Sequence, residues 1–192
     1  MTAVVSRSFN VLTCRPNFLE QNGNTIRLEP LTPPNKIPIF LHDTLSGAAA
    51  ALDAAIIAWN ARLPAGVQFE RVGTSCGAGP SCITVTSPLQ ADCGFAYKEF
   101  DANGVLTGNL QLRLRPDWSD FSPDGLQRTF VHELGHFLGL DDSSPSCGSS
   151  DASMQPEYDC AAPTVMHDVT INDYLPVQDS SYGGQPKVSC GF

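Results

Sequence analysis

The sequence lacks several features that would each point to a class of partner. No stretch approaches the roughly 18 consecutive apolar residues that a membrane-spanning helix needs, so no membrane partner is expected. Lys and Arg number 11 against 20 Asp and Glu, the net charge is -9, and no basic run occurs. Because phosphate binding needs clustered positive charge, this balance argues against nucleic acid as a partner.

Other absences concern chemistry and localisation. The chain has no glycine-rich phosphate loop, no G-x-S-x-G motif and no paired C-x-x-C of the kind that builds structural zinc sites. Residues 1–7 show no cationic segment leading into an apolar one, so no signal peptide is predicted. Two expectations remain open on this ground: an intracellular protein, or a mature domain with an added initiator Met.

Seven cysteines favour the second expectation. Cys76 and Cys82 lie in a loop rich in Gly, Ser and Pro, and Cys147 and Cys160 bracket another loop. Both pairs are typical of disulfides that staple loops, which form in an oxidising compartment. The sequence therefore predicts a secreted, extracellular protein. The alternative is reduced cysteines that act as small buried hydrophobic residues.

Periodicity predicts an alternation of helices and strands. A helix is expected over 46–63, where apolar residues form a single stripe. A second should begin after the N-cap Ser122 with Pro123 in its first turn, and end near Leu138. Strands are expected at 37–41, 67–72, 83–86, 93–100 and 109–114. In the first strand, Pro38 suggests an edge position or the start of the strand.

This order predicts an α/β (α+β) fold in which two long helices lie against one sheet. With 192 residues and 42% hydrophobic residues, the chain fits one domain over 1–192. The first 35 residues are expected to be an irregular arm. The part beyond Gly139 is expected to be built from loops.

The segment His132-Glu133-Leu134-Gly135-His136 carries the strongest chemical signal. Two histidines four residues apart lie on one face of a helix, roughly 5–6 Å apart at Cβ, which suits two imidazoles on one zinc ion. Glu133 lies beside that pair, where it can act as a base without binding the metal.

The longer segment 132–142 resembles the metzincin pattern H-E-x-x-H-x-x-G-x-x-H/D, with aspartate at the last position as in snapalysin-like members. The resemblance implies that a bend at Gly139 brings Asp142 to the metal as third ligand. Asp141 and His167 remain as alternatives for that ligand. Met166 matches the methionine turn under the metal, with Met154 as the alternative.

The N-terminal part, including Trp59 and the strand 67–72, is similar to matrixin-like catalytic domains. This implies a zincin-like fold with a twisted, mostly parallel sheet and an antiparallel edge strand. It also implies a subdomain 1–139 that carries the active-site helix, and a small, loop-rich subdomain 140–192. In the family the edge strand pairs with an extended substrate. By position, the corresponding residues of this chain are Gly94, Phe95, Ala96 and Tyr97.

The predicted function is that of a zinc-dependent metalloendopeptidase with one catalytic Zn²⁺, in which Glu133 activates a zinc-bound water against a peptide bond. Protein or peptide substrates and a monomeric state are expected. One alternative is a gluzincin-type site with Glu157 as third ligand, although Pro156 opposes a helix there. Another is a zinc-binding domain without catalysis.

Three further features have two interpretations each. Asp117, Asp120 and Asp124 are a candidate structural calcium site, but a carboxylate cluster at a helix N-terminus is preferred. Cys14 is expected to form a disulfide with Cys190 rather than to block a metal. His42 is expected to be a structural or surface residue near the end of a strand.

Overall fold

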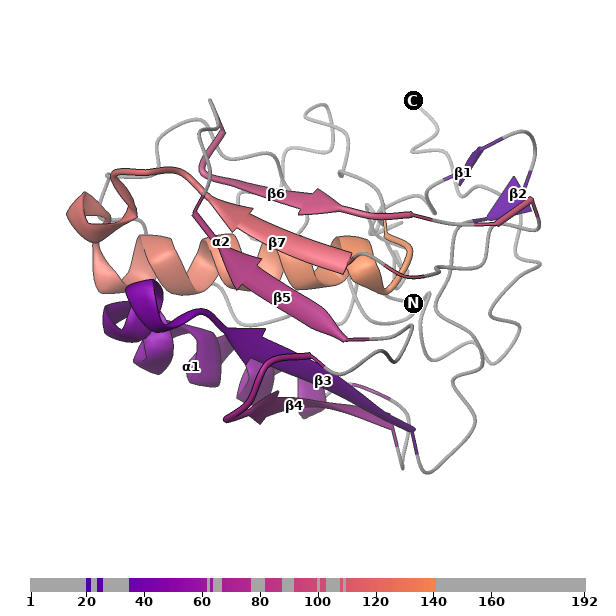
Figure 1. The fold of residues 1–192 in the computed structure, drawn as a ribbon, viewed down its shortest axis with the longest axis horizontal. Helices are drawn as coiled ribbons and strands as arrows, with labels where there is room; N and C mark the ends of the chain where they lie inside the picture. Colours follow the sequence, from indigo (N-terminus) through magenta and orange to yellow (C-terminus); the bar gives the residue numbers. More distant parts are fainter. Residues whose placement is uncertain are drawn as a thin grey trace, which may run out of the picture.

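A five-stranded mixed sheet with two helices makes up the main body of the protein (Figure 1). The computed structural model describes residues 20–21, 24–25, 35–61, 63, 67–76, 82–87, 92–99, 101–102, 108 and 110–140. The strands of the sheet are β3 (Asn35–Leu41), β4 (Val67–Val72), β5 (Ile83–Thr86), β6 (Gly94–Tyr97) and β7 (Leu110–Leu114). The helices are α1 (Ala49–Asn60), which follows the 3-10 helix η1 (Asp43–Ala48), and α2 (Pro123–Phe137).

The strand order is β4-β3-β5-β7-β6. Every neighbouring pair is parallel except β6 with β7, which is antiparallel. The predicted fold class, a mostly parallel sheet with an antiparallel edge strand and two long helices, is therefore confirmed. Both helices lie on the same face of the sheet (Figure 1). None of the described helices is long and apolar enough to cross a bilayer.

The expectation that Pro38 marks an edge strand is wrong, because β3 lies between β4 and β5. The register explains why proline is tolerated there. Pairing with β4 runs from Asn35 to Phe40, whereas pairing with β5 begins only at Ile39. At Pro38 itself the strand thus has a neighbour on one side, so a missing N–H need not remove a ladder hydrogen bond.

The other differences from the sequence prediction are small. A two-residue antiparallel pair, β1 (Glu20–Gln21) with β2 (Asn24–Thr25), lies within the arm that was expected to be irregular. The first helix splits into η1 and α1, with non-helical φ and ψ at Leu45. The strand expected over 93–100 is shorter, Gly94–Tyr97.

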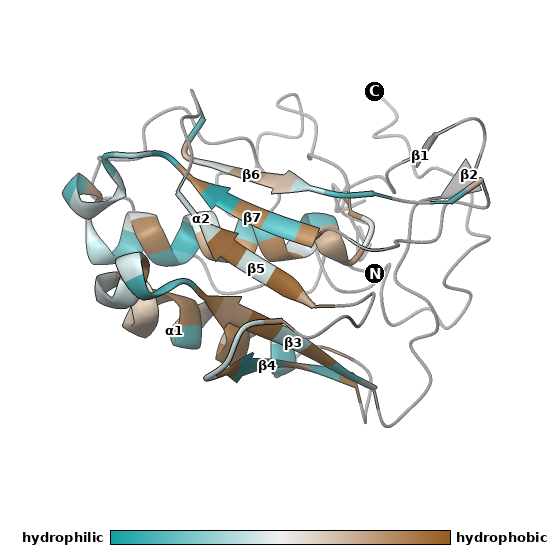
Figure 2. Cartoon of the chain, in the orientation of Figure 1, coloured by the Kyte–Doolittle hydropathy of each residue, from teal (hydrophilic) through white to brown (hydrophobic). Residues whose placement is uncertain are grey.

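The core is formed between the helices and the covered face of the sheet. The alternation predicted for β7 is confirmed, since Leu110, Leu112 and Leu114 are buried while the residues between them are partly exposed. In Figure 2, β3 and β5 are hydrophobic over most of their length, and β7 alternates between hydrophobic and hydrophilic residues. Such alternation is typical of a strand with one buried face.

Two side chains tie α1 to its surroundings through backbone atoms. The buried indole Nε1 of Trp59 donates to the carbonyl of Val131 in α2, at 2.8 Å. Asn60 makes a pair of hydrogen bonds with Phe69 in β4: its Nδ2 donates to the carbonyl at 2.9 Å, and its Oδ1 accepts from the N–H at 2.8 Å. These contacts hold α1 in register with both the sheet and α2.

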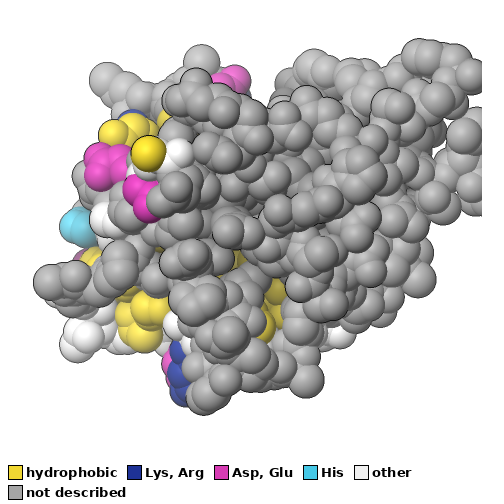
Figure 3. Space-filling view, turned by 90° about the vertical axis from the view of Figure 1, so that its right-hand side faces the viewer, with side chains coloured by type: hydrophobic (Ala, Val, Ile, Leu, Met, Phe, Trp, Pro, Cys, Tyr) yellow, Lys and Arg dark blue, Asp and Glu magenta, His cyan; other side chains and the backbone are white. Residues whose placement is uncertain are grey.

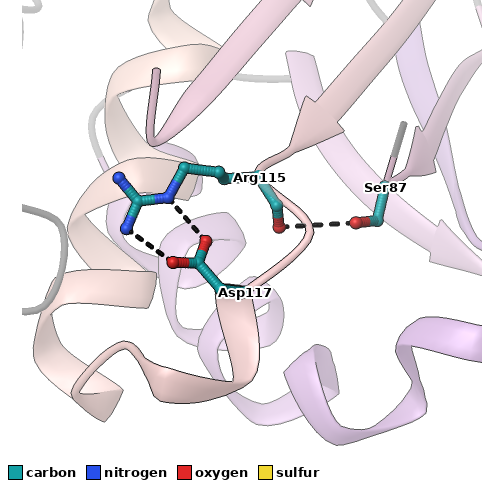
Figure 4. Close-up of polar contacts among 3 residues, drawn as sticks. All are labelled: Ser87, Arg115 and Asp117. Atoms are coloured by element: carbon teal, nitrogen blue, oxygen red, sulfur yellow. Dashed lines mark hydrogen bonds and ion pairs between the residues drawn. The ribbon is translucent and has the colours of Figure 1, made fainter. Parts of the chain in front are cut away.

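The turn between β7 and α2 is organised by Arg115 (Figure 4). Its guanidinium donates two hydrogen bonds to Asp117, at 2.5 and 3.0 Å, and its carbonyl accepts from the hydroxyl of Ser87 at 3.4 Å. The hydrogen bonds from Arg115 hold the pKa of Asp117 below its usual value. The stability that this pair contributes to the folded state is thus present above the ordinary aspartate pKa. It is lost as the pH falls through the lowered pKa of Asp117.

Asn60→Ala should destabilise the protein by about 1–3 kcal/mol, because it leaves the N–H and the carbonyl of Phe69 without their side-chain partner. Urea unfolding followed by circular dichroism measures this change. Gln68→Ala is the control, at an exposed position of β4 next to Phe69. Its free energy of unfolding should stay within about 0.5 kcal/mol of that of the parent. Equal effects of the two substitutions would contradict the role assigned to Asn60.

Candidate metal centre

The candidate site is built on the last two turns of α2. Ser122 caps the helix by accepting a hydrogen bond from the N–H of Gly125 at 3.0 Å, and Pro123 follows in the first turn, as predicted. The helix buries Phe130, Leu134 and Phe137 completely. The same helix also buries two polar residues of the motif, His132 at 8% exposure and Glu133 at 5%.

The structure brings His132, Glu133 and His136 together. One potential ligand atom from each of the three lies within 4.8 Å of the other two. The Nε2 atoms of the two histidines are 3.1 Å apart, and their rings are nearly perpendicular, at 87°. Two nitrogens bound at about 2.0–2.1 Å to one tetrahedral zinc ion are about 3.3 Å apart, so the observed spacing fits a shared ion.

The end of α2 orients one of these imidazoles. Gly139 has a φ of 85°, as its predicted role as a helix C-cap requires. The N–H of Leu140 donates to the carbonyl of Gly135 and that of Gly139 to the carbonyl of His136, both at 3.1 Å, which is the Schellman pattern. The bend brings the carbonyl of Leu140 to 2.9 Å from Nδ1 of His136.

This contact has a direct chemical consequence. A carbonyl oxygen can only accept a hydrogen bond. Nδ1 of His136 therefore carries the ring proton and donates a hydrogen bond to the carbonyl of Leu140. The lone pair of the neutral ring is then on Nε2, which faces His132. Backbone carbonyls commonly fix metal-binding histidines in this way. Two imidazole nitrogens that face each other in this way fit two of the ligand positions of one zinc ion.

Several predicted residues lie outside the part of the chain that the structure describes. They are Cys14, Asp141, Asp142, Cys147, Met154, Glu157, Cys160, Met166, His167 and Cys190. The third ligand, the methionine turn and the alternatives for each therefore stay predictions. The subdomain division at 139/140 and a calcium ion near Asp117 also stay predictions.

The remaining predicted residues are described. Cys76 and Cys82 form the expected disulfide. His42 is exposed and caps η1, since its Nδ1 accepts from the N–H of Thr44 at 3.4 Å. Gly94 and Ala96 are buried on β6, the antiparallel edge strand, whereas Phe95 is 40% exposed.

Two participants in the site were not found from the sequence. The carbonyl of Leu140 is a backbone group, which no side-chain pattern reveals. Thr129, 1% exposed, lies one turn before Glu133 on the same helical face. Its spacing of four residues from Glu133 was a usable signal.

The described residues that are visible on the side of the molecule shown in Figure 3 differ in character. They include hydrophobic, acidic and basic side chains and a histidine.

No family model and no curated protein matches the sequence. The structure is similar to a chain of the GM1-bound form of the ECX AB5 holotoxin, with a TM-score of 0.52 and 15% identity over 94% of this chain and 93% of that one. At this identity the similarity shows a shared fold and nothing about function.

Two further matches have lower TM-scores. High choriolytic enzyme 1, a hatching enzyme zinc-protease from the medaka fish Oryzias latipes, gives a TM-score of 0.44 at 18% identity, covering 66% of this chain and 55% of that one. A myroilysin structure gives 0.42 at 16% identity, covering 73% and 58%. The match therefore spans little more than half the length of either protein.

Gly139→Ala should weaken zinc binding about 10- to 100-fold, because the residue must adopt a positive φ for the Leu140 carbonyl to reach His136. Competition with a chromogenic zinc chelator measures the affinity. Gly73→Ala is the matched control, since a methyl group there meets nothing within 4 Å. Wild-type affinity in Gly139→Ala would show that the bend does not orient the imidazole.

Proposed function

We propose that this chain is a zinc-dependent endopeptidase. The observation that carries the proposal is the 3.1 Å approach of Nε2 of His132 to Nε2 of His136, with the carboxylate of Glu133 beside them. Two histidines whose Nε2 atoms face the same point in space can bind one divalent ion there. A buried carboxylate next to that ion, on the same helix, is the position that a general base requires.

His132 and His136 would hold the zinc ion through Nε2, and Asp142 is the proposed third ligand. When bound, zinc supplies a Lewis acid that activates water and polarises the scissile carbonyl. Glu133 accepts the proton of the attacking water and returns it to the leaving amine. Burial of Glu133 supports this role, because a carboxylate shielded from solvent interacts more strongly with a nearby cation.

The finer parts of the proposal concern the substrate and the surroundings of the metal. We place protein or peptide substrates along β6, where Gly94, Phe95, Ala96 and Tyr97 form the edge of the sheet. Main-chain hydrogen bonds to an edge strand bind extended peptides with little regard to sequence. Met166 is the proposed methionine beneath the metal.

The proposed site of action is outside the cell. The Cys76–Cys82 disulfide supports this, because disulfides persist in oxidising compartments. Cys93 is disulfide-bonded as well.

Glu133→Gln should retain one zinc per chain and lower kcat by about 10²- to 10⁴-fold, because the amide cannot accept the proton. His132→Ala should lose both the metal and the activity. Zinc content after dialysis and cleavage of casein or gelatin measure the two effects, and a zinc chelator should abolish cleavage by the parent. Near-normal turnover by Glu133→Gln would remove Glu133 from its role, and a metal-binding but inactive parent would favour the non-catalytic alternative.

Replacing the candidate third ligands one at a time tests the ligand set. Asp142→Ala should weaken zinc binding by at least about tenfold, because a charged ligand is lost, whereas His167→Ala, Asp141→Ala and Glu157→Ala should bind zinc like the parent. Isothermal titration calorimetry of the metal-free proteins with zinc gives the zinc affinities. If Glu157→Ala is the weak binder, the site is of the gluzincin type.

A further inference from the structure

The strand β6 approaches α2 at the residues of the site. Gly94, at the start of β6, is buried against the face of α2 that carries Thr129 and Glu133. A Cβ atom added at Gly94 would lie 2.7 Å from Cγ and 2.9 Å from Oε1 of Glu133, and 2.8 Å from Cγ2 of Thr129. Carbon atoms in ordinary contact are about 3.5–4.0 Å apart. Even one methyl group therefore does not fit.

Neither of the two side chains can move away easily. Thr129 is almost fully buried, and its hydroxyl donates to the carbonyl of Gly125 at 3.0 Å, which directs its methyl group. In Glu133 the closest atom is Cγ, which lies near the backbone, so turning the carboxylate alone relieves only the contact with Oε1. These two side chains thus leave no room for a Cβ atom at Gly94, whose backbone lies beside Glu133.

The strand cannot easily retreat either. Gly94 pairs with Leu114 in the register of β6 with β7. The N–H of Arg115 donates to the carbonyl of Cys93 at 3.2 Å, and the Arg115 side chain is held by Asp117. These bonds fix the start of β6 relative to the turn that leads into α2.

We infer that Gly94 is the positioning residue for Glu133: its bare backbone forms a wall that holds the glutamate side chain beside His132 and His136. This inference rests on the proposed function and deepens it. This role is additional to the proposed main-chain binding of substrate along β6, since the wall faces α2 rather than the open edge of the sheet. Gly94 affects the reaction through the position of Glu133.

The kinetic test compares Gly94→Ala with Gly73→Ala, whose added methyl group meets nothing within 4 Å. Gly94→Ala should lower kcat at least about 100-fold through displacement of the base, with KM within threefold of the parent and one zinc per chain. Gly73→Ala should match the parent. The double variant Gly94→Ala/Thr129→Ser, which removes the Thr129 methyl group but keeps its hydroxyl, should remain inactive. If it regains activity, crowding acts through Thr129 and the inference is wrong.

A stability cycle tests the same contact without any activity measurement. In the zinc-free full chain, Gly94→Ala should lower Tm by about 2–12 °C through overpacking. In the background of Glu133→Ala, which removes two of the three close atoms, the same substitution should lower Tm by less than half as much. An equal loss in both backgrounds would overturn the inference. This background also yields a result if Gly94→Ala alone fails to fold.

The two experiments separate the inference from the function on which it rests. A parent protein that binds no zinc and cleaves nothing would defeat the proposed function, while the stability cycle still reports whether Gly94 bounds Glu133. A smaller Tm loss in the Glu133→Ala background, together with an active Gly94→Ala enzyme, would show that the contact between Gly94 and Glu133 exists but does not position the base.

Discussion

The packing of α2 between α1 and the edge of the sheet is the constraint on which the rest of the structure depends. Phe130, Leu134 and Phe137 anchor one side of the helix in the core with no exposed surface. Between them, the same turns bury His132 and Glu133, although burying such groups is unfavourable unless they are hydrogen-bonded or coordinate a metal. A helix that was anchored less firmly would turn these residues toward solvent. The apolar side of α2 therefore provides the stability that its polar side requires.

Backbone groups, more than side chains, set the geometry of the site. The carbonyl of Leu140 orients His136, and the bare backbone of Gly94 limits the space around Glu133. The carbonyl of Val131, next to His132, accepts the indole N–H of Trp59 and so links the site to α1. Backbone positions depend on the whole sheet and on both helices, so the site is rigid to the extent that the fold is rigid. This is the preorganisation that the proposed function needs.

Element by element, the sequence predicted most of the described fold because each segment had a clear local signal. Strands 67–72 and 83–86 have the predicted bounds, and the second helix begins after Ser122 as its cap and proline require. The exception was Pro38, which was expected on an edge strand and lies in an inner one. The missing N–H of proline constrains only its own position in the ladder. Where β5 begins to pair with β3 depends on sheet register, which the local sequence does not encode.

By itself, the sequence determined which residues can perform chemistry: the spacing of four between two histidines places them on one helical face, and the glycine three residues later permits a positive φ. These are properties of a single helix and its cap, so they follow from local composition. The tertiary structure alone decided that β6 lies against Glu133 and that the indole of Trp59 reaches the carbonyl of Val131. These contacts join segments that are separated along the chain, and only the packing of the sheet and of α1 against α2 brings them into place.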